Sequence, residues 1–427
     1  MDESELLRDV VFAFQGIDGK YVRYDQMIDG FVVDAKVGVP RATRDLIRKL
    51  CELGWLFRKL KNFVDTSNIQ LTGGLVVQSF AATIENELLS YYKLIASLES
   101  QITEKSSVTL RQLMVWTLEP MERLKMMAII VDSCKGVKGG ALLGMIQSYA
   151  KHGDPLIRSF VQSVLNSACV PFFNTIKSWV FEGELEDPFQ EFFVEVNLEV
   201  PIESMWFKRY SLRHNMLPGF VSVEFGAKIL KIGKTINFIR HCCNDSEFVI
   251  DSNAMAQASR SFSYQNVTQL ELVINRIANI ADQRVIHLLF EKFKVQVHCT
   301  ALRKYLLLGQ GDFTQQLLDL LQPDLDKPSH TMYRHNLLAI LESAIRGSNA
   351  QYDDKDVLDR LDVRMISKTS STGWDIFCLD YNMTMPLNTI FTQETMITYT
   401  KIFQFLWTIK RVESSLDSTW KRHTHVS

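Results

Sequence analysis

The stretch Gly233-Lys234-Thr235 could hold a phosphate group, because it matches the end of a phosphate-binding loop. That motif also requires a glycine five positions before Gly233, and residue 228 is a lysine. A phosphate cradle needs backbone N–H groups in a turn after a strand, whereas this stretch lies among isoleucines at helical spacing. The sequence therefore predicts a helix here and no nucleotide site.

A second glycine pair, Gly309-Gln310-Gly311, has the opening spacing of a dinucleotide-binding turn. The third glycine of that fingerprint is absent, because residue 314 is threonine, and the preceding segment has a helical rather than a strand pattern. Glycine admits positive φ angles and commonly ends a helix. We therefore interpret these glycines as the end of a helix.

Potential metal ligands and acid/base groups are equally poorly arranged. The histidines and cysteines of His241-Cys242-Cys243 and of His298-Cys299 follow one another directly in the sequence, whereas zinc chelation uses ligands two to four residues apart. The carboxylates Glu182, Glu184, Glu186 and Asp187 share one acidic turn without apolar shielding, which favours a solvated surface over a tuned acid/base pair. We predict no catalytic residue, no cofactor and no metal, and hence a protein that is not an enzyme.

Helices must carry most of the chain, because apolar residues recur every three or four positions over long stretches. These stretches are residues 4–14, 41–63, 76–98, 110–131, 141–150, 156–181, 265–308 with or without an internal break, and 394–416. Residues 21–33 favour a small hairpin around Asp29-Gly30. Alternation over 361–365 and 374–378 predicts a second hairpin. The predicted fold is all-α: elongated, stacked helical bundles with a small β-hairpin in the C-terminal domain.

Composition narrows the class of partner. The 427 residues carry a formal net charge of −2, which gives no overall attraction to nucleic acid or to an anionic membrane. Seven scattered cysteines without Cys-x-x-Cys spacing indicate a reducing compartment. The acidic N-terminus is unlike a signal peptide, and no apolar run reaches the roughly 18 residues of a membrane span. We expect protein partners, no nucleic acid and no membrane insertion.

Charge is segregated along the chain. Residues 178–207 hold eight acidic side chains and no Lys or Arg, and residues 208–240 hold seven basic side chains and one acid. Two interpretations remain open: two solvated faces, or complementary edges that meet on neighbouring subunits. The polar, aperiodic residues 244–264 are predicted to form an interdomain linker.

Taken in order, several phrases resemble the gamma-tubulin complex component family. They are Phe14-Gln-Gly-Ile-Asp-Gly-Lys20, Leu110-Arg-Gln-Leu-Met-Val-Trp116, Lys135-Gly-Val-Lys-Gly-Gly140, Gly153-Asp-Pro155, Gly183-Glu-Leu-Glu-Asp187 with Glu191-Phe-Phe193, Lys304-Tyr-Leu-Leu-Leu-Gly-Gln-Gly-Asp-Phe313, Arg360-Leu-Asp-Val-Arg364, Gly373-Trp-Asp375 and Phe403-Gln-Phe-Leu-Trp407. Each is weak alone, but their order and spacing together are specific. The first phrase is closest to the component 3 branch of the family.

The resemblance implies a non-enzymatic scaffold subunit that templates microtubule nucleation. It implies an N-terminal grip domain over residues 1–243 that contacts a neighbouring component, the linker 244–264, and a partial C-terminal grip domain over 265–427 that binds gamma-tubulin. The implied partners are gamma-tubulin, sister component 2 and other grip-motif components. The implied location is the cytoplasm and cytoskeleton, at a microtubule-organising centre or spindle pole.

Compared with family members, the chain is expected to be shortened at both ends. For partner contacts we choose exposed loop residues, since these recognise partners more often than buried ones do. They are Gln310, Gly311 and Asp312 after the long helix, with Arg364 and Asp375 on the second hairpin. Plain turn formation is the competing explanation for each. Stacked helices alone also leave a second function open, a helical-rod tether or adaptor of membrane traffic.

Overall fold

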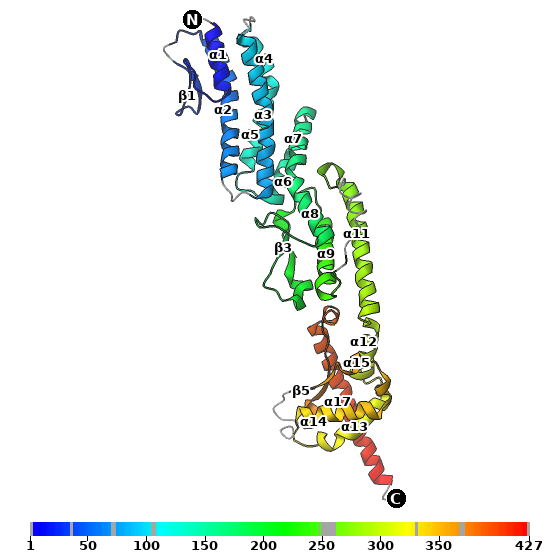
Figure 1. Ribbon diagram of the computed structural model, residues 1–427. Helices are drawn as coiled ribbons and strands as arrows, with labels where there is room; N and C mark the ends of the chain where they lie inside the picture. Colours follow the sequence, from blue (N-terminus) through cyan, green and yellow to red (C-terminus); the bar gives the residue numbers. More distant parts are fainter. Residues whose placement is uncertain are drawn as a thin grey trace. The chain divides into compact units, whose positions relative to one another are not determined.

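The computed structural model describes residues 3–34, 37–69, 74–103, 108–246, 248, 262–328, 332–366 and 372–424. Helices dominate these residues, and the strands among them form three two-stranded antiparallel sheets (Figure 1). The predicted all-α class with small hairpins is therefore confirmed. The chain divides into two compact units: unit 1 comprises Met1–Leu198, Tyr210–Asn237 and Phe248–Ile280, and unit 2 comprises Glu199–Arg209, Phe238–Glu247 and Ala281–Ser427.

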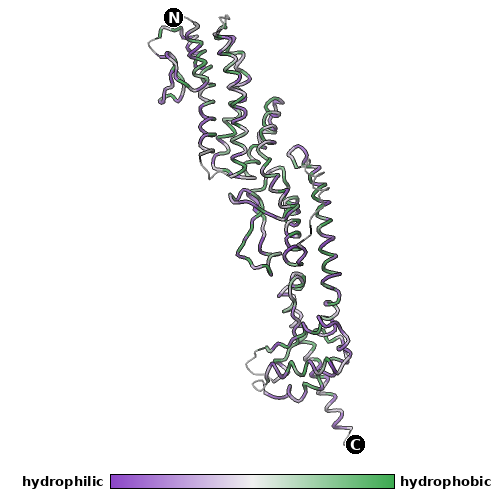
Figure 2. Tube along the Cα trace, viewed as in Figure 1, coloured by the Kyte–Doolittle hydropathy of each residue, from purple (hydrophilic) through white to green (hydrophobic). Residues whose placement is uncertain are grey.

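Unit 1 begins with a helical bundle. Helix α1 (Glu3–Phe14) and the hairpin β1 (Val22–Asp25) and β2 (Gly30–Val33) pack on the long helices α2 (Arg41–Ile69) and α3 (Leu75–Thr103). The buried face of α3 repeats every three or four residues, which is why the sequence predicts it: Val76, Phe80, Ala81, Ile84, Leu88, Tyr91, Ile95 and Leu98. Figure 2 shows polar and apolar residues mixed along these helices.

Two helices predicted as continuous are broken. The predicted helix 110–131 is α4 (Leu110–Trp116) followed by α5 (Leu118–Ser133), with Thr117 between them. The predicted helix 156–181 is α7 (Pro155–Ala168) followed by α8 (Val170–Glu182). Pro171 explains the second break, because proline lacks an N–H and is tolerated only in the first turn of a helix. Asp154 begins α7 by accepting a hydrogen bond from Leu156 N at 2.9 Å.

The rest of unit 1 contains α6 (Gly139–Tyr149), α9 (Val223–Asn237) and a hairpin that periodicity did not predict, β3 (Val194–Val196) with β4 (Tyr210–Leu212). Three-residue strands are too short to show alternation. The hairpin brings the acidic run against the basic run, since Arg213 Nη2 lies 3.1 Å from Glu195 Oε1. At this pair the two charge runs meet within one chain.

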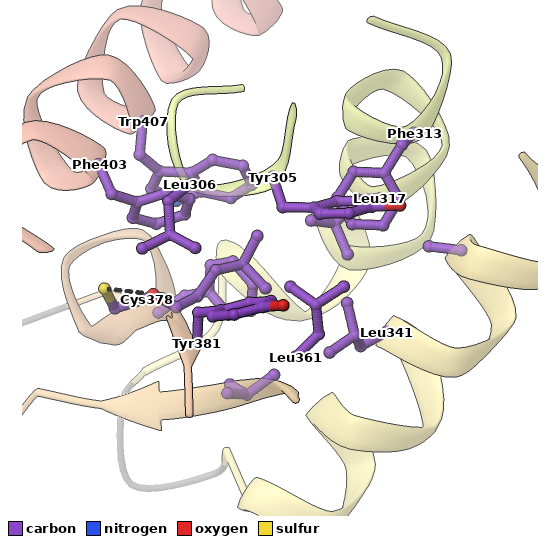
Figure 3. Packing of buried hydrophobic residues seen from close by; sticks show 14 of the residues in the cluster. Tyr305, Leu306, Phe313, Leu317, Leu341, Leu361, Cys378, Tyr381, Phe403 and Trp407 are labelled. Atoms are coloured by element: carbon purple, nitrogen blue, oxygen red, sulfur yellow. Dashed lines mark hydrogen bonds between the residues drawn. The ribbon is translucent and has the colours of Figure 1, made fainter. Parts of the chain in front are cut away.

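Unit 2 surrounds one apolar cluster. The cluster is built by α12 (Val295–Ala301), the π-helical turn Leu302–Leu306, α13 (Gly311–Leu325), α14 (Arg334–Gly347), β5 (Leu361–Met365), α16 (Gly373–Ile376), β6 (Phe377–Tyr381) and α17 (Gln393–Thr424). Figure 3 shows Phe403 and Trp407 of α17 pointing into the cluster that also holds Tyr305 and Leu306. Two aromatic rings of the last helix, those of Phe403 and Trp407, are therefore part of the core of unit 2.

Three boundaries differ from the sequence prediction. The predicted long helix 265–308 is α11 (Val267–His287), a π-helical turn Leu288–Lys292 and then α12, with the break at Lys294, whose φ is +44°. The second hairpin is confirmed, but Trp374 and Ile376 lie in α16 and the strand begins at Phe377. Helix α17 continues to Thr424, past the predicted end.

Of the predicted linker 244–264, residues 247 and 249–261 lie outside the described residues. Over the part of the chain that is described, no single helix is long and apolar enough to cross a membrane, whereas α7 and α8 together, bent by 45°, reach that length and composition.

Candidate partner-binding surface

The Gly233-Lys234-Thr235 stretch lies inside α9, as predicted, and serves packing. A Cβ atom added at Gly233 would fall within the indole ring of Trp179, closer than the 3.0 Å that real Cβ atoms keep. Trp179 is fully buried, and its Nε1 donates to the carbonyl oxygen of Ile229 at 2.9 Å. Burial lowers the pKa of Lys234. These backbone N–H groups are held in a helix, so they are not free to cradle a phosphate.

The histidine and cysteine pairs have structural partners. His298 is buried, its Nδ1 lies 2.7 Å from the Tyr381 hydroxyl, and its Nε2 lies 3.5 Å from Asp356 Oδ2. Burial lowers the pKa of His298, so the imidazole is neutral near pH 7. Burial raises the pKa of Cys242 to about 11 and that of Cys243 to about 12. Among the described residues no group of three or more His, Cys, Asp or Glu side chains is placed to hold a metal.

Glu191 connects two helix N-termini, a role that sequence reasoning missed. Its Oε2 accepts from Val76 N at 3.0 Å at the start of α3, and its carbonyl oxygen accepts from Gly140 N at 3.2 Å at the start of α6. Gly74 and Gly139 leave the room, since a Cβ at either would overlap Glu191. A helix N-terminus favours an anion, although burial raises the pKa of this carboxyl. In the sequence, the only sign of this role of Glu191 was the glycine pair Gly139-Gly140, which precedes Glu191 along the chain.

The first glycine phrase fixes the turn that leads into β1. Gly16 has a φ of +72°, which ends α1 as predicted. Gly19 has no positive φ but lies against the buried Asp9, where a Cβ would come within 2.6 Å of the carboxyl carbon. Asp9 in turn accepts hydrogen bonds from the backbone N–H groups of Tyr21 and Val22. Position 19 therefore requires a glycine, because any side chain there would collide with Asp9.

The second glycine phrase ends its helix differently from the prediction. The positive φ belongs to Leu308 at +52°, and neither Gly309 nor Gly311 has one. Gly309 is needed for close approach instead, because its Cβ would lie 2.7 Å from Arg303 O. Gln310 then precedes α13, and Thr314 N donates to its carbonyl oxygen at 3.0 Å. The corner is thus set by a leucine in the left-handed region and a glycine packed on the preceding turn.

Around this corner lies a polar network that was not predicted. Asp353 accepts from Lys304 Nζ at 2.7 and 2.9 Å and from the Tyr305 hydroxyl at 2.7 Å. Asp312 Oδ2 accepts from Asn349 N at 2.8 Å, and this bond lowers the pKa of Asp312. Lys304 and Tyr305 belong to the glycine phrase itself, but their shared acceptor is 48 residues away from Tyr305. Only the folded structure shows that Asp353 is the shared partner of Lys304 and Tyr305.

The five predicted contact residues fall into three places. Gln310, Gly311 and Asp312 are consecutive at the start of α13, half-buried for Gln310 and exposed for the other two. Arg364 is exposed on β5, opposite Cys378.

Asp375 was predicted to lie on the second hairpin, but in the structure it lies in α16. There it caps the helix with Thr372 and lies 3.6 Å from Arg411 of α17. Over the described residues, no hydrogen bond or ion pair joins Gln310, Gly311 or Asp312 to Arg364 or Asp375.

Comparison with known proteins supplies the family context. The family model for the gamma tubulin complex component N-terminal region matches residues 7–292, and the model for the C-terminal region matches residues 295–427. Gamma-tubulin complex component 3 of Arabidopsis thaliana is 44% identical over 440 residues, covering 98% of this chain and 52% of that protein. Spindle pole body component 98 of Dictyostelium discoideum is 33% identical over 521 residues, covering 98% and 64%.

A more distant relative distinguishes branches of the family. Gamma-tubulin complex component 2 of Arabidopsis thaliana is 26% identical over 456 residues, covering 99% of this chain and 66% of that protein. The higher identity to component 3 confirms the predicted branch. The chain spans about half the length of the component 3 relatives. The membrane-traffic alternative gains no support from these relatives.

Proposed function

This chain belongs to the gamma-tubulin complex component family, and we propose on that basis that it is a structural, non-enzymatic subunit of a gamma-tubulin complex. In this role it helps to template microtubule nucleation at a microtubule-organising centre or spindle pole, within the cytoskeleton of the cytoplasm. The observation that carries the proposal is that both family models follow one another across residues 7–292 and 295–427.

The proposed division of labour follows the family's two regions. Residues 1–243 contact a sister component such as component 2, residues 244–264 link the regions, and residues 265–427 bind gamma-tubulin. Other grip-motif components are further partners. Support comes from the folding of each unit around buried helices, since rigid helices hold an interface without the entropy cost of ordering a loop.

Two of the predicted contact residues remain the best candidates for gamma-tubulin binding. Gly311 is exposed with no atom within 4 Å of a Cβ added to it, and Arg364 is exposed on a strand. Gln310, Asp312 and Asp375 also remain proposed, although the carboxylates of Asp312 and Asp375 already have partners within the chain. Exposed arginines are frequent anchors in protein interfaces.

Co-expression tests both the proposed function and the proposed contact residue Arg364. The tagged chain is expressed with gamma-tubulin and component 2 from the same organism, purified and sedimented. Recovery of both partners is expected, and recovery of neither would refute the function. Arg364→Glu should weaken gamma-tubulin recovery without changing component 2 recovery, because it reverses the charge at the proposed contact.

The matched control for that variant is Arg346→Glu on α14, whose side chain is 80% exposed. This variant should leave gamma-tubulin recovery unchanged. Equal losses in Arg364→Glu and Arg346→Glu would reject the site while leaving the function standing.

A further inference from the structure

A cavity of about 550 Å³ lies in unit 1 between the β1–β2 hairpin, α2 and the C-terminal end of α5. Its walls come from the hairpin, from one side of α2 between Trp55 and Thr66, and from Val131 and Lys135. Ligand pockets typically enclose roughly 300–1,000 Å³, so this cavity has room for a side chain of a partner or a small molecule. We call it the α2 pocket.

Three cations line the α2 pocket: Arg58, Lys59 and Lys135. The two lysines share one carboxylate, since Asp132 accepts from Lys59 Nζ and lies 2.8 Å from Lys135 Nζ. The Arg58 guanidinium stacks on Tyr24, with its Cζ 4.1 Å from the ring centroid. Among the described residues, Arg58 has no hydrogen-bond acceptor and no carboxylate within salt-bridge distance. Stacking therefore positions the guanidinium while its N–H donors stay open for an oxyanion.

The carboxylates at the α2 pocket already accept hydrogen bonds from its walls. Among the described lining residues Asp29 is the one carboxylate, and it accepts from the Tyr24 hydroxyl and from Trp55. With Asp132 included, three cations face two carboxylates. The excess charge at the pocket is positive, and the open donors are those of Arg58. An anionic ligand fits this arrangement.

Aromatic side chains form much of the remaining wall. Tyr24, Trp55 and Phe63 line the α2 pocket and are half-buried. A ring on the ligand can pack against such side chains, whereas a guanidinium with nearby lysines recognises a phosphate group. An aryl phosphate combines both properties. On a protein that group is the side chain of phosphotyrosine.

We propose that the α2 pocket binds a phosphotyrosine side chain of a partner protein. Arg58 donates a pair of hydrogen bonds to the phosphate, and Lys59 and Lys135 add positive charge. The phenyl ring packs against Trp55 and Phe63. Because the contact needs the phosphate, binding depends on tyrosine phosphorylation of the partner. The pocket lies in unit 1, whereas the residues proposed to bind gamma-tubulin lie in unit 2.

Fluorescence anisotropy tests the proposal with the purified full chain and a labelled pentapeptide that carries phosphotyrosine between glycines. Saturable binding is expected, and it should weaken as salt is added, because salt screens the charges. The same peptide with tyrosine, which lacks the phosphate, should bind about tenfold more weakly or worse. The same peptide with phosphoserine, which lacks the ring, should also bind about tenfold more weakly or worse.

Substitutions of the cations test the position of the site. Arg58→Gln should weaken binding of the phosphotyrosine peptide by about tenfold or more, and Lys135→Gln should weaken it less, because lysine lacks the paired donors of arginine. Both side chains are exposed, so the core is unchanged. The matched controls are Arg48→Gln and Lys61→Gln, which remove the same charges from exposed positions of α2 outside the pocket lining. Both controls should bind as the unaltered chain does.

Three outcomes would overturn the proposal. The first is a lack of saturable binding of the phosphotyrosine peptide. The second is equal affinity for the phosphoserine peptide, which would show that the aromatic wall is not used. The third is an equal loss in Arg58→Gln and Arg48→Gln, which would show a diffuse effect of charge. The peptide experiment contains neither gamma-tubulin nor component 2, so its failure leaves the proposed function standing.

Discussion

Gly233 offers a sharp test of how α8 and α9 pack. Replacing Gly233 by alanine adds one methyl group in the middle of α9. In an unstrained helix this change stabilises by about 1 kcal/mol, because alanine is the better helix former. Here the new Cβ would stand inside the 3.0 Å limit from Trp179, so the indole or the helix must shift by more than an ångström.

The magnitude follows from the surroundings of Trp179. The ring is 0% exposed, so it has no free space to move into. Overpacking a filled core costs about 1–3 kcal/mol. Displacing the indole also threatens its bond to Ile229 O, and a buried donor left unsatisfied costs about 1–3 kcal/mol. Less the helix-propensity gain, we expect Gly233→Ala to destabilise unit 1 by about 1–5 kcal/mol.

The control is the same substitution in another helix interior. A Cβ at Gly144 in α6 would meet its nearest neighbour, Gly219 N, at 3.5 Å, an ordinary contact. Gly144→Ala should therefore stabilise by about 0.5–1 kcal/mol. Urea unfolding followed by circular dichroism measures both changes, and hydrogen exchange locates the Gly233→Ala effect in α8 and α9. If Gly233→Ala stabilised the chain as Gly144→Ala does, the packing argument would be refuted.

Three further predictions concern single positions. Glu191→Ala should lower the free energy of unfolding by about 1–3 kcal/mol in urea, because the N-terminus of α3 loses its side-chain acceptor; exposed Glu184→Ala should change little. Gly309→Ala should destabilise unit 2, whereas Gly311→Ala, which meets no neighbour, should be neutral or slightly stabilising; an equal effect in thermal unfolding would contradict the close approach. Burial depresses the pKa of His298, so stability is full above about pH 6.5 and falls as pH drops below it; His298→Asn should flatten that slope.

Sequence reasoning worked where a pattern repeats many times within one element. Residues 41–63 and 76–98 show several turns of apolar spacing, and both are helices in the structure, extended at their ends. Sequence reasoning failed where a single residue separates two helices. Thr117 separates α4 from α5 although the apolar spacing continues across it, and its hydroxyl donates to the Leu113 carbonyl in the preceding turn. Such a break depends on what each helix packs against.

For the candidate site residues, the sequence predicted the local element only in part, and the surroundings of these residues were not visible in it. Arg364 is on the predicted strand, whereas Asp375 is in a helix and lies near Arg411. The acceptor shared by Lys304 and Tyr305 is Asp353, which no short-range pattern indicates. A partner separated by about 50 residues of chain is set by long-range packing alone.

By itself the sequence determined the helical class, the family and the absence of a nucleotide motif, since each depends on local periodicity or on ordered short phrases. Tertiary structure alone decided what the glycines do. Gly16 supplies a positive φ, but Gly19, Gly233 and Gly309 are required because another part of the chain lies where a Cβ would stand. A glycine looks the same in sequence whether its backbone angle or its neighbour requires it. Only the packed chain distinguishes the two.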